Sequence, residues 1–485
     1  MKTNTLDFDA QALRERILDL AMRGKLVPQD PNDEPASVLL EKIKAEKEEL
    51  VKEKKIKKSK PLPAITDDEK PFNIPDSWEW VRFSELFNIE GGSQPPKSTF
   101  SDTGGKGKIR LFQIRDYGEN PVPVYIPIDK AKKISQIGDI LLARYGASLG
   151  KVFFAEYGAY NVALAKVLFN FKSEDFILKK YLFYYFKSEL YQNFVRSNSR
   201  SAQAGFNKSD LNRLVFPVPP ILEQKRIAAK IAQLFALLRK VESSTQQYAE
   251  LQTLLKSKVL NLAMRGKLVK QDPNDEPASV LLEKIKGEKA ELAKEKKIKK
   301  SKPLPPITDE EKPFDIPDSW EWVRLESVCD EIGDIDHKMP RKTINGQYLY
   351  ISPKDFTKNG IDYDHAKRIS EDDFKKLSQK FLPKKGDLIF PRYGTIGIIR
   401  KINTERPVLV SYSCCLIRSN KNMSNDFIQY ELKSKITKKE IDKYVNRSTQ
   451  PNVGLKSIKS FLFPLPPLEE QKRIVSKIIE LFSLL

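Results

Sequence analysis

Histidine and cysteine are scarce in this chain of 485 residues, which contains only two histidines and three cysteines. The histidines, His337 and His365, are too few for a Ser-His-Asp triad or a multi-histidine metal site. The cysteines, Cys329, Cys414 and Cys415, form no Cys-x-x-Cys pair and are too sparse for a disulfide framework. The sequence therefore favours a reducing compartment, the cytoplasm, and argues against chemistry that depends on these residues.

The motifs of nucleotide-using and methyl-transferring enzymes are also missing. No Gly-x-x-x-x-Gly-Lys-Ser/Thr phosphate loop and no strand followed by Gly-x-Gly-x-x-Gly occurs, and residues 104–107 read only as a flexible glycine turn. There is no Asp-Pro-Pro-Tyr or Asn-Pro-Pro-Phe motif of the kind that holds a target amine. The N-terminus has no apolar signal core, and no run is long enough to cross a membrane. We therefore expect a non-catalytic chain with no cofactor or metal of its own and no membrane contact.

Positive charge, in contrast, is abundant. The formal net charge is +20, the pI is about 9.4 and 31% of the residues are charged. A protein this basic most often binds a polyanion such as nucleic acid, although an acidic partner protein or solubility alone is the alternative. Two lysine-rich tracts, residues 52–60 and 294–302, are equally compatible with contacts to DNA phosphates or a partner and with a solvated helix end.

The chain contains one long segment twice. Residues 22–80 recur with few changes as residues 264–322, from Met-Arg-Gly-Lys-Leu-Val at the start to Ile-Pro-Asp-Ser-Trp-Glu-Trp near the end. The two copies then diverge and become similar again at the proline-rich residues 216–220 and 463–467. Two near-identical frames therefore hold two different inserts. A duplicated scaffold with two unlike surfaces suggests one molecule that reads two different targets at a fixed separation.

Apolar spacing predicts three helices in this frame. One covers residues 8–24, a long central helix of roughly 60 Å covers residues 223–264, and the third covers the C-terminal residues. Each carries an apolar stripe suited to a coiled-coil-like seam with another helix. The predicted seam residues are Leu13, Ile17, Leu20, Ile227, Ile231, Leu234, Leu238, Leu255, Val259, Leu262, Ile474, Ile478 and Leu481.

The order of these helices indicates a circularly permuted internal repeat. The C-terminal helix repeats the start of the central helix, since Ile474 and Ile478 match Ile227 and Ile231, and the N-terminal helix matches its second half. The two terminal helices together thus reproduce what the central helix does alone. We expect the two chain ends to lie close together and to pack against the central helix, which gives pseudo-two-fold symmetry.

The inserts combine short β-like runs, such as residues 140–143 and 388–390, with helical pieces such as residues 181–194. The expected fold class is α+β, with two α/β recognition domains joined by long antiparallel coiled-coil-like helices. The expected boundaries are 1–75 for an N-terminal helical segment and charged linker, 76–220 for the first recognition domain, 221–315 for the central helix and second linker, 316–467 for the second recognition domain and 468–485 for the C-terminal helix.

The inserts share a strand that runs into an Arg-Tyr-Gly turn, at residues 138–146 and 386–394. Arginine can donate two hydrogen bonds to guanine in the major groove, glycine permits close backbone approach, and a basic residue that follows can neutralise a phosphate. An arginine in an intradomain salt bridge is the alternative. We favour DNA contact because the turn is shared while its surroundings differ. The candidates are Arg144, Tyr145, Gly146, Lys151, Arg392, Tyr393, Gly394 and Arg400.

Two weaker patterns are also shared by the inserts. Glutamine and asparagine suit paired hydrogen bonds to adenine, although a polar loop can be merely polar. The second pattern aligns Ser201, Gln203, Asn207 and Lys208 with Ser448, Gln450, Asn452 and Lys456. The third aligns Gln113, Arg115 and Asp116 with Ser352, Lys354 and Asp355.

Together these features resemble the specificity (S) subunit of type I restriction–modification enzymes. The marks are Ile-Pro-Asp-Ser-Trp-Glu-Trp before each insert, the repeated Ala-Met-Arg-Gly-Lys-Leu-Val, Pro-Val-Pro-Pro-Ile-Leu-Glu-Gln-Lys-Arg-Ile at 217–227 and Pro-Leu-Pro-Pro-Leu-Glu-Glu-Gln-Lys-Arg-Ile at 464–474. The resemblance covers essentially the whole chain, and the ordered set of motifs is highly specific.

The resemblance implies two target-recognition domains that each read one half of a split sequence in double-stranded DNA. The helices would set the gap and dock two methyltransferase (modification) subunits, which bind S-adenosylmethionine and methylate adenine at N6. Two restriction subunits that use ATP and magnesium could join them. The alternatives are a stand-alone DNA-binding regulator with two reading heads and an enzyme with an unrecognised nuclease or methyltransferase site. The missing motifs weigh against that enzyme.

Overall fold

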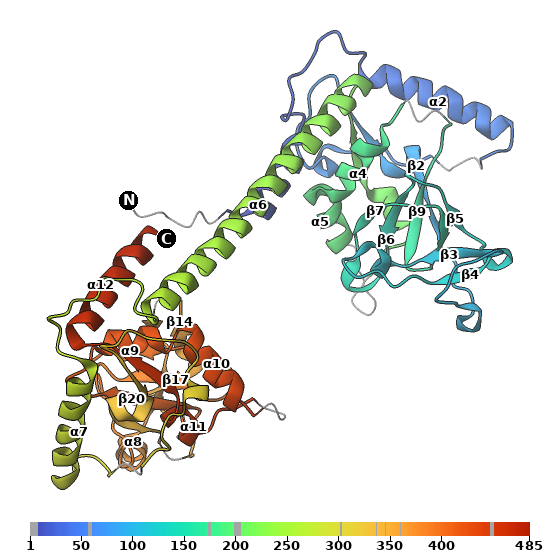
Figure 1. The fold of residues 1–485 in the computed structure, drawn as a ribbon. Helices are drawn as coiled ribbons and strands as arrows, with labels where there is room; N and C mark the ends of the chain where they lie inside the picture. Colours follow the sequence, from blue (N-terminus) through green and yellow to red (C-terminus); the bar gives the residue numbers. More distant parts are fainter. Residues whose placement is uncertain are drawn as a thin grey trace. The chain divides into compact units, whose positions relative to one another are not determined.

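The computed structural model describes residues 8–56, 61–172, 176–197, 205–300, 303–335, 337–344, 346–358, 360–446 and 451–485. The chain divides into two compact units, Met1–Gln246 and Gln247–Leu485, each with its own hydrophobic core (Figure 1). Helix α6 (Ile221–Ala263), 43 residues long, contributes its first part to unit 1 and its remainder to unit 2. None of the helices in the described ranges is both long and apolar enough to cross a membrane.

The insert of unit 1 is built on two small sheets. The first, in the order β2-β9-β6-β7, is antiparallel throughout, and the second, β4-β3-β8-β5, contains one parallel pair, β3 with β8. The strands are β2 (Phe87–Gly91), β3 (Lys108–Phe112), β4 (Tyr125–Pro127), β5 (Ile134–Ser135), β6 (Ile140–Ala143), β7 (Val152–Phe154), β8 (Gly158–Tyr160) and β9 (Leu164–Phe169).

The two ends of this insert are held together by a separate strand pair. Strand β1 (Glu79–Arg82) pairs antiparallel with β10 (Val215–Val218), so the Trp-Glu-Trp motif lies beside the proline-rich segment where the repeat resumes. The short helix α3 (Phe83–Leu86) follows β1 directly. The insert is therefore a loop of about 130 residues closed at its base by frame residues.

Two helices of unit 1 replace the single helix expected over residues 181–194. Helix α4 (Lys179–Lys187) ends and α5 (Glu189–Ser197) begins at Ser188, whose backbone N–H and hydroxyl both donate to the carbonyl of Tyr185, at 3.0 and 2.7 Å. A serine hydroxyl competes with the backbone in this way, and it divides the helix although the apolar periodicity continues.

Unit 2 repeats this architecture with different details. Its main sheet, β12-β20-β17-β18, is antiparallel, its second sheet, β16-β13-β19, again contains a parallel pair, and β11 pairs with β21 at the base. The strands are β11 (Glu321–Arg324), β12 (Cys329–Gly333), β13 (Tyr348–Ile351), β14 (Phe356–Thr357), β15 (Gly360–Ile361), β16 (Lys367–Ile369), β17 (Leu388–Pro391), β18 (Arg400–Lys401), β19 (Val408–Val410), β20 (Cys414–Ser419) and β21 (Leu462–Leu465). Its insert helices are α8 (Glu371–Ser378), α9 (Asn425–Glu431), α10 (Lys435–Tyr444) and α11 (Leu455–Lys459). The α+β class expected for each insert is confirmed.

In unit 1, helix α1 (Ala10–Met22) runs antiparallel to the first part of α6. Arg14 near the start of α1 pairs with Glu242, with Nη1 and Oε1 2.9 Å apart, while Gln29 just beyond its end donates to Glu223 at 2.6 Å. The second frame helix, α2 (Ala36–Lys52), also packs on this core through one apolar face. The coiled-coil-like antiparallel arrangement is thus present inside the unit.

In unit 2 the same arrangement is assembled from different parts of the chain. Helix α12 (Leu468–Leu484) runs antiparallel to the second part of α6, since Gln252 donates to the carbonyl of Leu485 and Gln271 donates to Glu470 at 2.6 Å. Helix α7 (Ala278–Lys294) takes the place of α2. Each unit is therefore complete only because the repeat is circularly permuted. The two chain ends belong to different units, so their expected closeness stays a prediction.

The buried stripe on two of these helices differs from the predicted seam. Leu18 and Leu260 are buried, whereas the predicted Leu13 and Leu255 are 43% and 47% exposed. The buried stripe contains Ala and Met beside these leucines, so it is apolar like the predicted stripe. The spacing of apolar residues alone could therefore not choose between the two stripes. Four predicted seam residues are fully buried in their units: Ile227, Ile231, Ile474 and Ile478. The other predicted positions are partly buried: Ile17, Leu20, Leu234, Leu238, Val259, Leu262 and Leu481.

Candidate nucleic-acid interface

The predicted Arg-Tyr-Gly turns are present in both units at the end of a central strand. Strand β6 leads into Arg144, and strand β17 leads into Arg392. The glycines, Gly146 and Gly394, have φ values of +71° and +69°, in the left-handed region that favours glycine. A Cβ added to either would meet no atom within 4 Å. Among the described residues, the left-handed backbone and not a lack of space therefore explains why glycine occupies these two positions.

The structure brings this turn together with the second polar pattern. Tyr145 forms an isolated antiparallel bridge with Gly205, and Tyr393 forms the corresponding bridge with Asn452. Gly205 and Asn452 are thus equivalent, and the alignment of Asn207 with Asn452 made from the sequence is wrong. The polar side chains predicted at Gln203 and Gln450, with Ser201 and Ser448, lie outside the described residues.

Arg144 is presented without a carboxylate partner. Within the described part of the chain its guanidinium makes one hydrogen bond, from Nε to the carbonyl of Phe206 at 3.4 Å, and no ion pair. It lies 5.1 Å from the ring centre of Tyr145, which is itself 42% exposed. A stacked arginine and an exposed tyrosine on a glycine turn provide donors and a flat surface to a nucleic acid.

The equivalent Arg392 has a different environment, which argues against the DNA contact predicted for it. It is buried, and its Nη2 lies 2.9 Å from Oδ2 of Asp334, which is also buried. Asp334 is paired with Lys380 as well. The salt bridge considered as the alternative is therefore what unit 2 contains. Removing a buried arginine from its carboxylate costs several kcal/mol, so Arg392 is not available to a base.

The basic residues that follow each turn also differ. Lys151 is exposed, and its ammonium makes no hydrogen bond or ion pair with the residues that the structure describes. Arg400 donates to three backbone carbonyls, those of Gly360 at 3.0 Å, Ile399 at 2.9 Å and Thr357 at 2.5 Å. These bonds organise the loops around β15 and β18, and the contact of Arg400 with a phosphate stays a prediction.

The third pattern forms the same local structure in both units. A short 3-10 helix follows β3 at Ile114–Tyr117 and follows β13 at Pro353–Asp355. Its aspartate caps the turn, since Asp116 accepts from the N–H of Gln113 and Asp355 accepts from the N–H of Ser352, both at 2.7 Å. The aspartates are therefore structural, and the exposed basic residues at the equivalent positions are Arg115 and Lys354.

The remaining candidates divide in the same way. The side-chain oxygen of Asn207 accepts from Ser209 N–H at 2.9 Å and from its hydroxyl at 2.6 Å, so it orders its own turn, before the 3-10 helix Asp210–Arg213. Lys208 and Lys456 are exposed. Their contact with DNA stays a prediction, and a lysine that meets a phosphate adds affinity but no sequence information.

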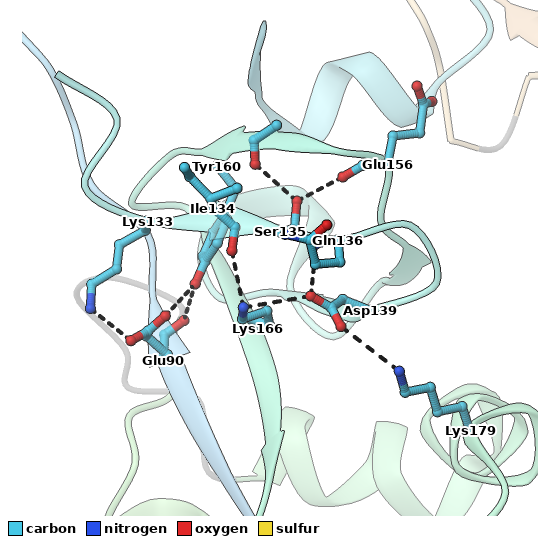
Figure 2. Close-up of polar contacts among 11 residues, drawn as sticks. Glu90, Lys133, Ile134, Ser135, Gln136, Asp139, Glu156, Tyr160, Lys166 and Lys179 are labelled. Carbon is cyan, nitrogen blue, oxygen red and sulfur yellow. Dashed lines mark hydrogen bonds and ion pairs between the residues drawn. The ribbon is translucent and has the colours of Figure 1, made fainter. Parts of the chain in front are cut away.

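A polar network links the sheets of the unit 1 insert (Figure 2). Glu90 accepts from Lys133 at 2.7 Å and from the hydroxyl of Tyr160 at 3.0 Å, and Asp139 lies 3.5 Å from Lys166 and 3.9 Å from Lys179. Burial alone would raise the pKa of Glu90, but the bonds from Lys133 and Tyr160 hold that pKa below its ordinary value. Glu90 and Asp139 are therefore already paired with partners inside unit 1.

Asp334 is the site residue that the sequence did not identify. It follows the end of β12, and its carboxylate faces Arg392, Lys380 and, at 3.6 Å, the ring of His337. No motif marks it, because the two inserts differ in sequence around it. The one available signal was the alternative reading of Arg392 as half of a salt bridge, which named no partner.

Two units on one frame, each presenting an Arg-Tyr-Gly turn and exposed basic side chains, define a protein with two recognition heads. Among the residues that the structure describes, no group of three His, Cys, Asp or Glu side chains could hold a metal ion. A family model described as the type I restriction modification DNA specificity domain matches residues 75–252 and 317–484. The chain belongs to this family.

Individual relatives agree. The chain is 34% identical to the type I restriction enzyme EcoAI specificity subunit and 32% identical to the EcoEI specificity subunit, both from Escherichia coli. Each comparison covers 98% of this chain and 89% of the relative. A solved structure concerned with complex assembly and conformational transition of the type I R-M system has the same fold, with a TM-score of 0.55, 19% identity and coverage of 85% of this chain and 92% of that chain. The chain is therefore a specificity subunit, the non-catalytic DNA-recognition component.

Proposed function

We propose that each unit reads one half of an asymmetric, bipartite DNA target. The observation that supports this is that one repeated frame carries two unlike surfaces. Arg144 makes no ion pair with the described residues, whereas Arg392 forms a buried ion pair with Asp334. Identical surfaces would select a symmetric target, and different surfaces select two different half-sites. Within unit 1 the proposed contacts are Arg144, Tyr145, Gly146, Lys151, Arg115, Gln113 and Lys208, and within unit 2 they are Tyr393, Gly394, Lys354, Asn452 and Lys456.

We further propose that the frame helices hold the two modification subunits and set the length of the gap between the half-sites. Helix α6 has 43 residues, which corresponds to about 65 Å of α-helix, and it carries exposed apolar side chains along its middle, including Leu251 and Leu254. Exposed leucines on a helix suit a partner surface. S-adenosylmethionine would be bound by the modification subunits, and ATP and magnesium by restriction subunits where these are present.

The experiment is to co-express the chain with a modification subunit from the same genome and to map N6-methyladenine across the host genome. A split, asymmetric motif with a fixed gap is the expected result. Absence of methylation from a complex whose assembly has been verified by light scattering would favour the other candidate, a stand-alone DNA-binding regulator with two reading heads. A symmetric motif would contradict the assignment of different half-sites to the two units.

A further inference from the structure

Strands β2 and β12 occupy equivalent places in the two units, and toward their ends their registers differ by one residue. In unit 1, Gly91 at the end of β2 pairs with Ala165 of β9. In unit 2, β12 contains a bulge between Cys329 and Glu331, and Gly333 at its end pairs with Leu416 of β20. A bulge places an extra residue in one strand and shifts everything beyond it.

This shift places Asp334 where unit 1 has Gly91. Ala165 and Cys415 are equivalent, because Ala165 pairs with Leu142 of β6 and Cys415 pairs with Phe390 of β17, two residues before the respective arginine. Gly91 is opposite Ala165, and the residue after Gly333 comes opposite Cys415. The bulge therefore exchanges a glycine for an aspartate at one structural position.

Both residues face the arginine of the turn. A Cβ added to Gly91 would lie 2.8 Å from Nη1 of Arg144, and that atom is also the nearest neighbour it would meet. At the same position in unit 2, the carboxylate of Asp334 lies 2.9 Å from Nη2 of Arg392. The two arginines thus approach the strand end in the same way, and only one of them finds a carboxylate there.

We propose that this strand-end residue decides whether the arginine of the turn reads DNA. Gly91 leaves Arg144 available to donate to the edge of a base. Guanine is the base that accepts two hydrogen bonds from arginine. Asp334 instead holds the Arg392 side chain inside unit 2 by the ion pair between them. The proposal rests on the proposed function, since it names the residue that controls readout in each half-site.

The surroundings keep the two states distinct. In unit 1, Glu90 precedes Gly91 directly, but its carboxylate accepts hydrogen bonds from Lys133 and Tyr160 and so does not compete for Arg144 (Figure 2). In unit 2 the side chain of Asp334 is 5% exposed and that of Arg392 is 6% exposed. A charge pair this deeply buried is not exchanged for a contact with hydrated DNA without a large loss of stability.

The test compares Gly91→Asp with Gly91→Asn in the full chain assembled with its modification subunits. Gly91 does not have a left-handed φ, so the backbone accepts both side chains. In either variant the new Cβ displaces Nη1 of Arg144, which lies 2.8 Å from its position, so the two variants share this change and differ in that only aspartate carries a charge. Binding is measured on the mapped target duplex and on duplexes altered one base pair at a time. The aspartate variant should bind the target about tenfold more weakly than the asparagine variant and lose base preference only in the half-site of unit 1. Equal binding by the two variants would overturn the proposal.

The same pair made in an Arg144→Ala background separates the mechanism from simple repulsion. Aspartate and asparagine should then bind equally, because there is no guanidinium to capture. A persisting defect of the aspartate would mean that it repels DNA directly, which also overturns the proposal. If the wild-type complex itself fails to methylate a split motif, the proposed function fails instead, and the two failures are thereby distinguished.

A second variant keeps the test decisive if Gly91→Asp does not fold, which thermal unfolding will show. Asp334→Asn removes the charge that holds Arg392 while preserving the size of the side chain. It should change base preference in the half-site of unit 2 by about threefold or more and leave the half-site of unit 1 unaltered. An unchanged preference in folded protein would show that Asp334 does not control readout.

Discussion

The indole nitrogen of Trp78 donates to the buried carboxylate of Glu223 at 2.8 Å, across 145 residues of sequence. Trp320 donates to Glu470 at the same distance in unit 2, across 150 residues. Burial raises the pKa of Glu223, while the bonds from Trp78 and Gln29 act to lower it. In each unit the contact joins the residue just before the strand that opens the insert to the first turn of the helix that follows the insert. It therefore closes the frame around inserts of different length and sequence.

The first prediction concerns this closure. Trp78→Phe removes the donor and leaves a buried carboxylate short of a partner, so we expect a loss of about 1–3 kcal/mol in the free energy of unfolding of unit 1, beyond any loss of packing. Calorimetric unfolding of the full chain measures it. Trp80→Phe is the matched control, since the Trp80 indole nitrogen is buried without a partner among the described contacts. Equal losses in the two variants would show that packing, not the hydrogen bond, dominates.

Much of this frame could be predicted from the sequence, because its evidence is repetition. The match between residues 22–80 and 264–322, and the recurrence of the 217–227 motif at 464–474, require the two halves to form the same contacts. Arg226 with Asp33 and Arg473 with Asp275 are one such repeated pair. Helix periodicity and the Trp-Glu-Trp alternation then supplied the elements, which the structure reproduces.

The site was predicted less well for an identifiable reason. Whether Arg392 is free depends on Asp334, which lies 58 residues away and reaches it only because β12 contains a bulge. A one-residue shift in strand register leaves no trace in local composition. The shared Arg-Tyr-Gly motif therefore predicted the backbone of both turns correctly. It could not show that the side chains of Arg144 and Arg392 have different partners.

The second prediction separates these two arginines. Arg144→Ala should weaken binding to the half-site of unit 1 by about 1–3 kcal/mol, with relaxed preference at one base pair and no change in stability. Arg392→Ala should instead destabilise unit 2, by up to about 3–5 kcal/mol where Lys380 does not compensate for the lost partner of Asp334. Binding titrations and unfolding on the same samples distinguish them. An equal loss by Arg144→Ala on all DNA sequences would make Arg144 a phosphate contact.

The third prediction concerns the helical frame. Ile231 and Ile478 are fully buried inside their own units, so an aspartate there would unfold the unit rather than only block assembly. We expect Ile231→Ala and Ile478→Ala each to cost about 2–5 kcal/mol. Leu251→Ala, at a side chain 56% exposed, should change stability by less than about 0.5 kcal/mol and weaken assembly with the modification subunits. A Leu251→Ala complex of unchanged affinity would place the partner surface elsewhere.

The fourth prediction addresses the gap between the half-sites. Inserting one helical turn of four residues into the exposed middle of α6, with a matching extension of α1 or α12, should lengthen the gap in the methylated motif while both half-sites keep their sequences. Genome-wide methylation mapping of the variant reads the gap directly. A motif with the original gap would show that α6 does not set the spacing.

The fifth prediction follows from Glu431 at the end of α9, which is buried and accepts from the hydroxyl of Thr437 at 3.1 Å. Burial raises the pKa of Glu431 to about 8, against the effect of Thr437 and with the help of the charge on Glu440. Between the ordinary value near 4.5 and about 8, the folded chain keeps a proton that the unfolded chain has lost. The stability that this protonated group contributes is therefore complete below about pH 4.5 and disappears as the pH rises through 8.

Glu431→Gln should remove this part of the pH dependence, because glutamine has no proton to lose. In the wild type the contribution falls by about 1.4 kcal/mol per pH unit within the window, so the stability difference between the two proteins should change with pH at up to that slope. Calorimetric unfolding of both between pH 5 and pH 9 measures it, and the difference cancels the other carboxyls of unit 2. Glu405→Gln, at a side chain 80% exposed, is the control and should follow the wild type. If Glu431→Gln and wild type unfold with the same pH dependence, Glu431 is ionised in the folded chain and α9 is held by a charge rather than by a buried neutral acid.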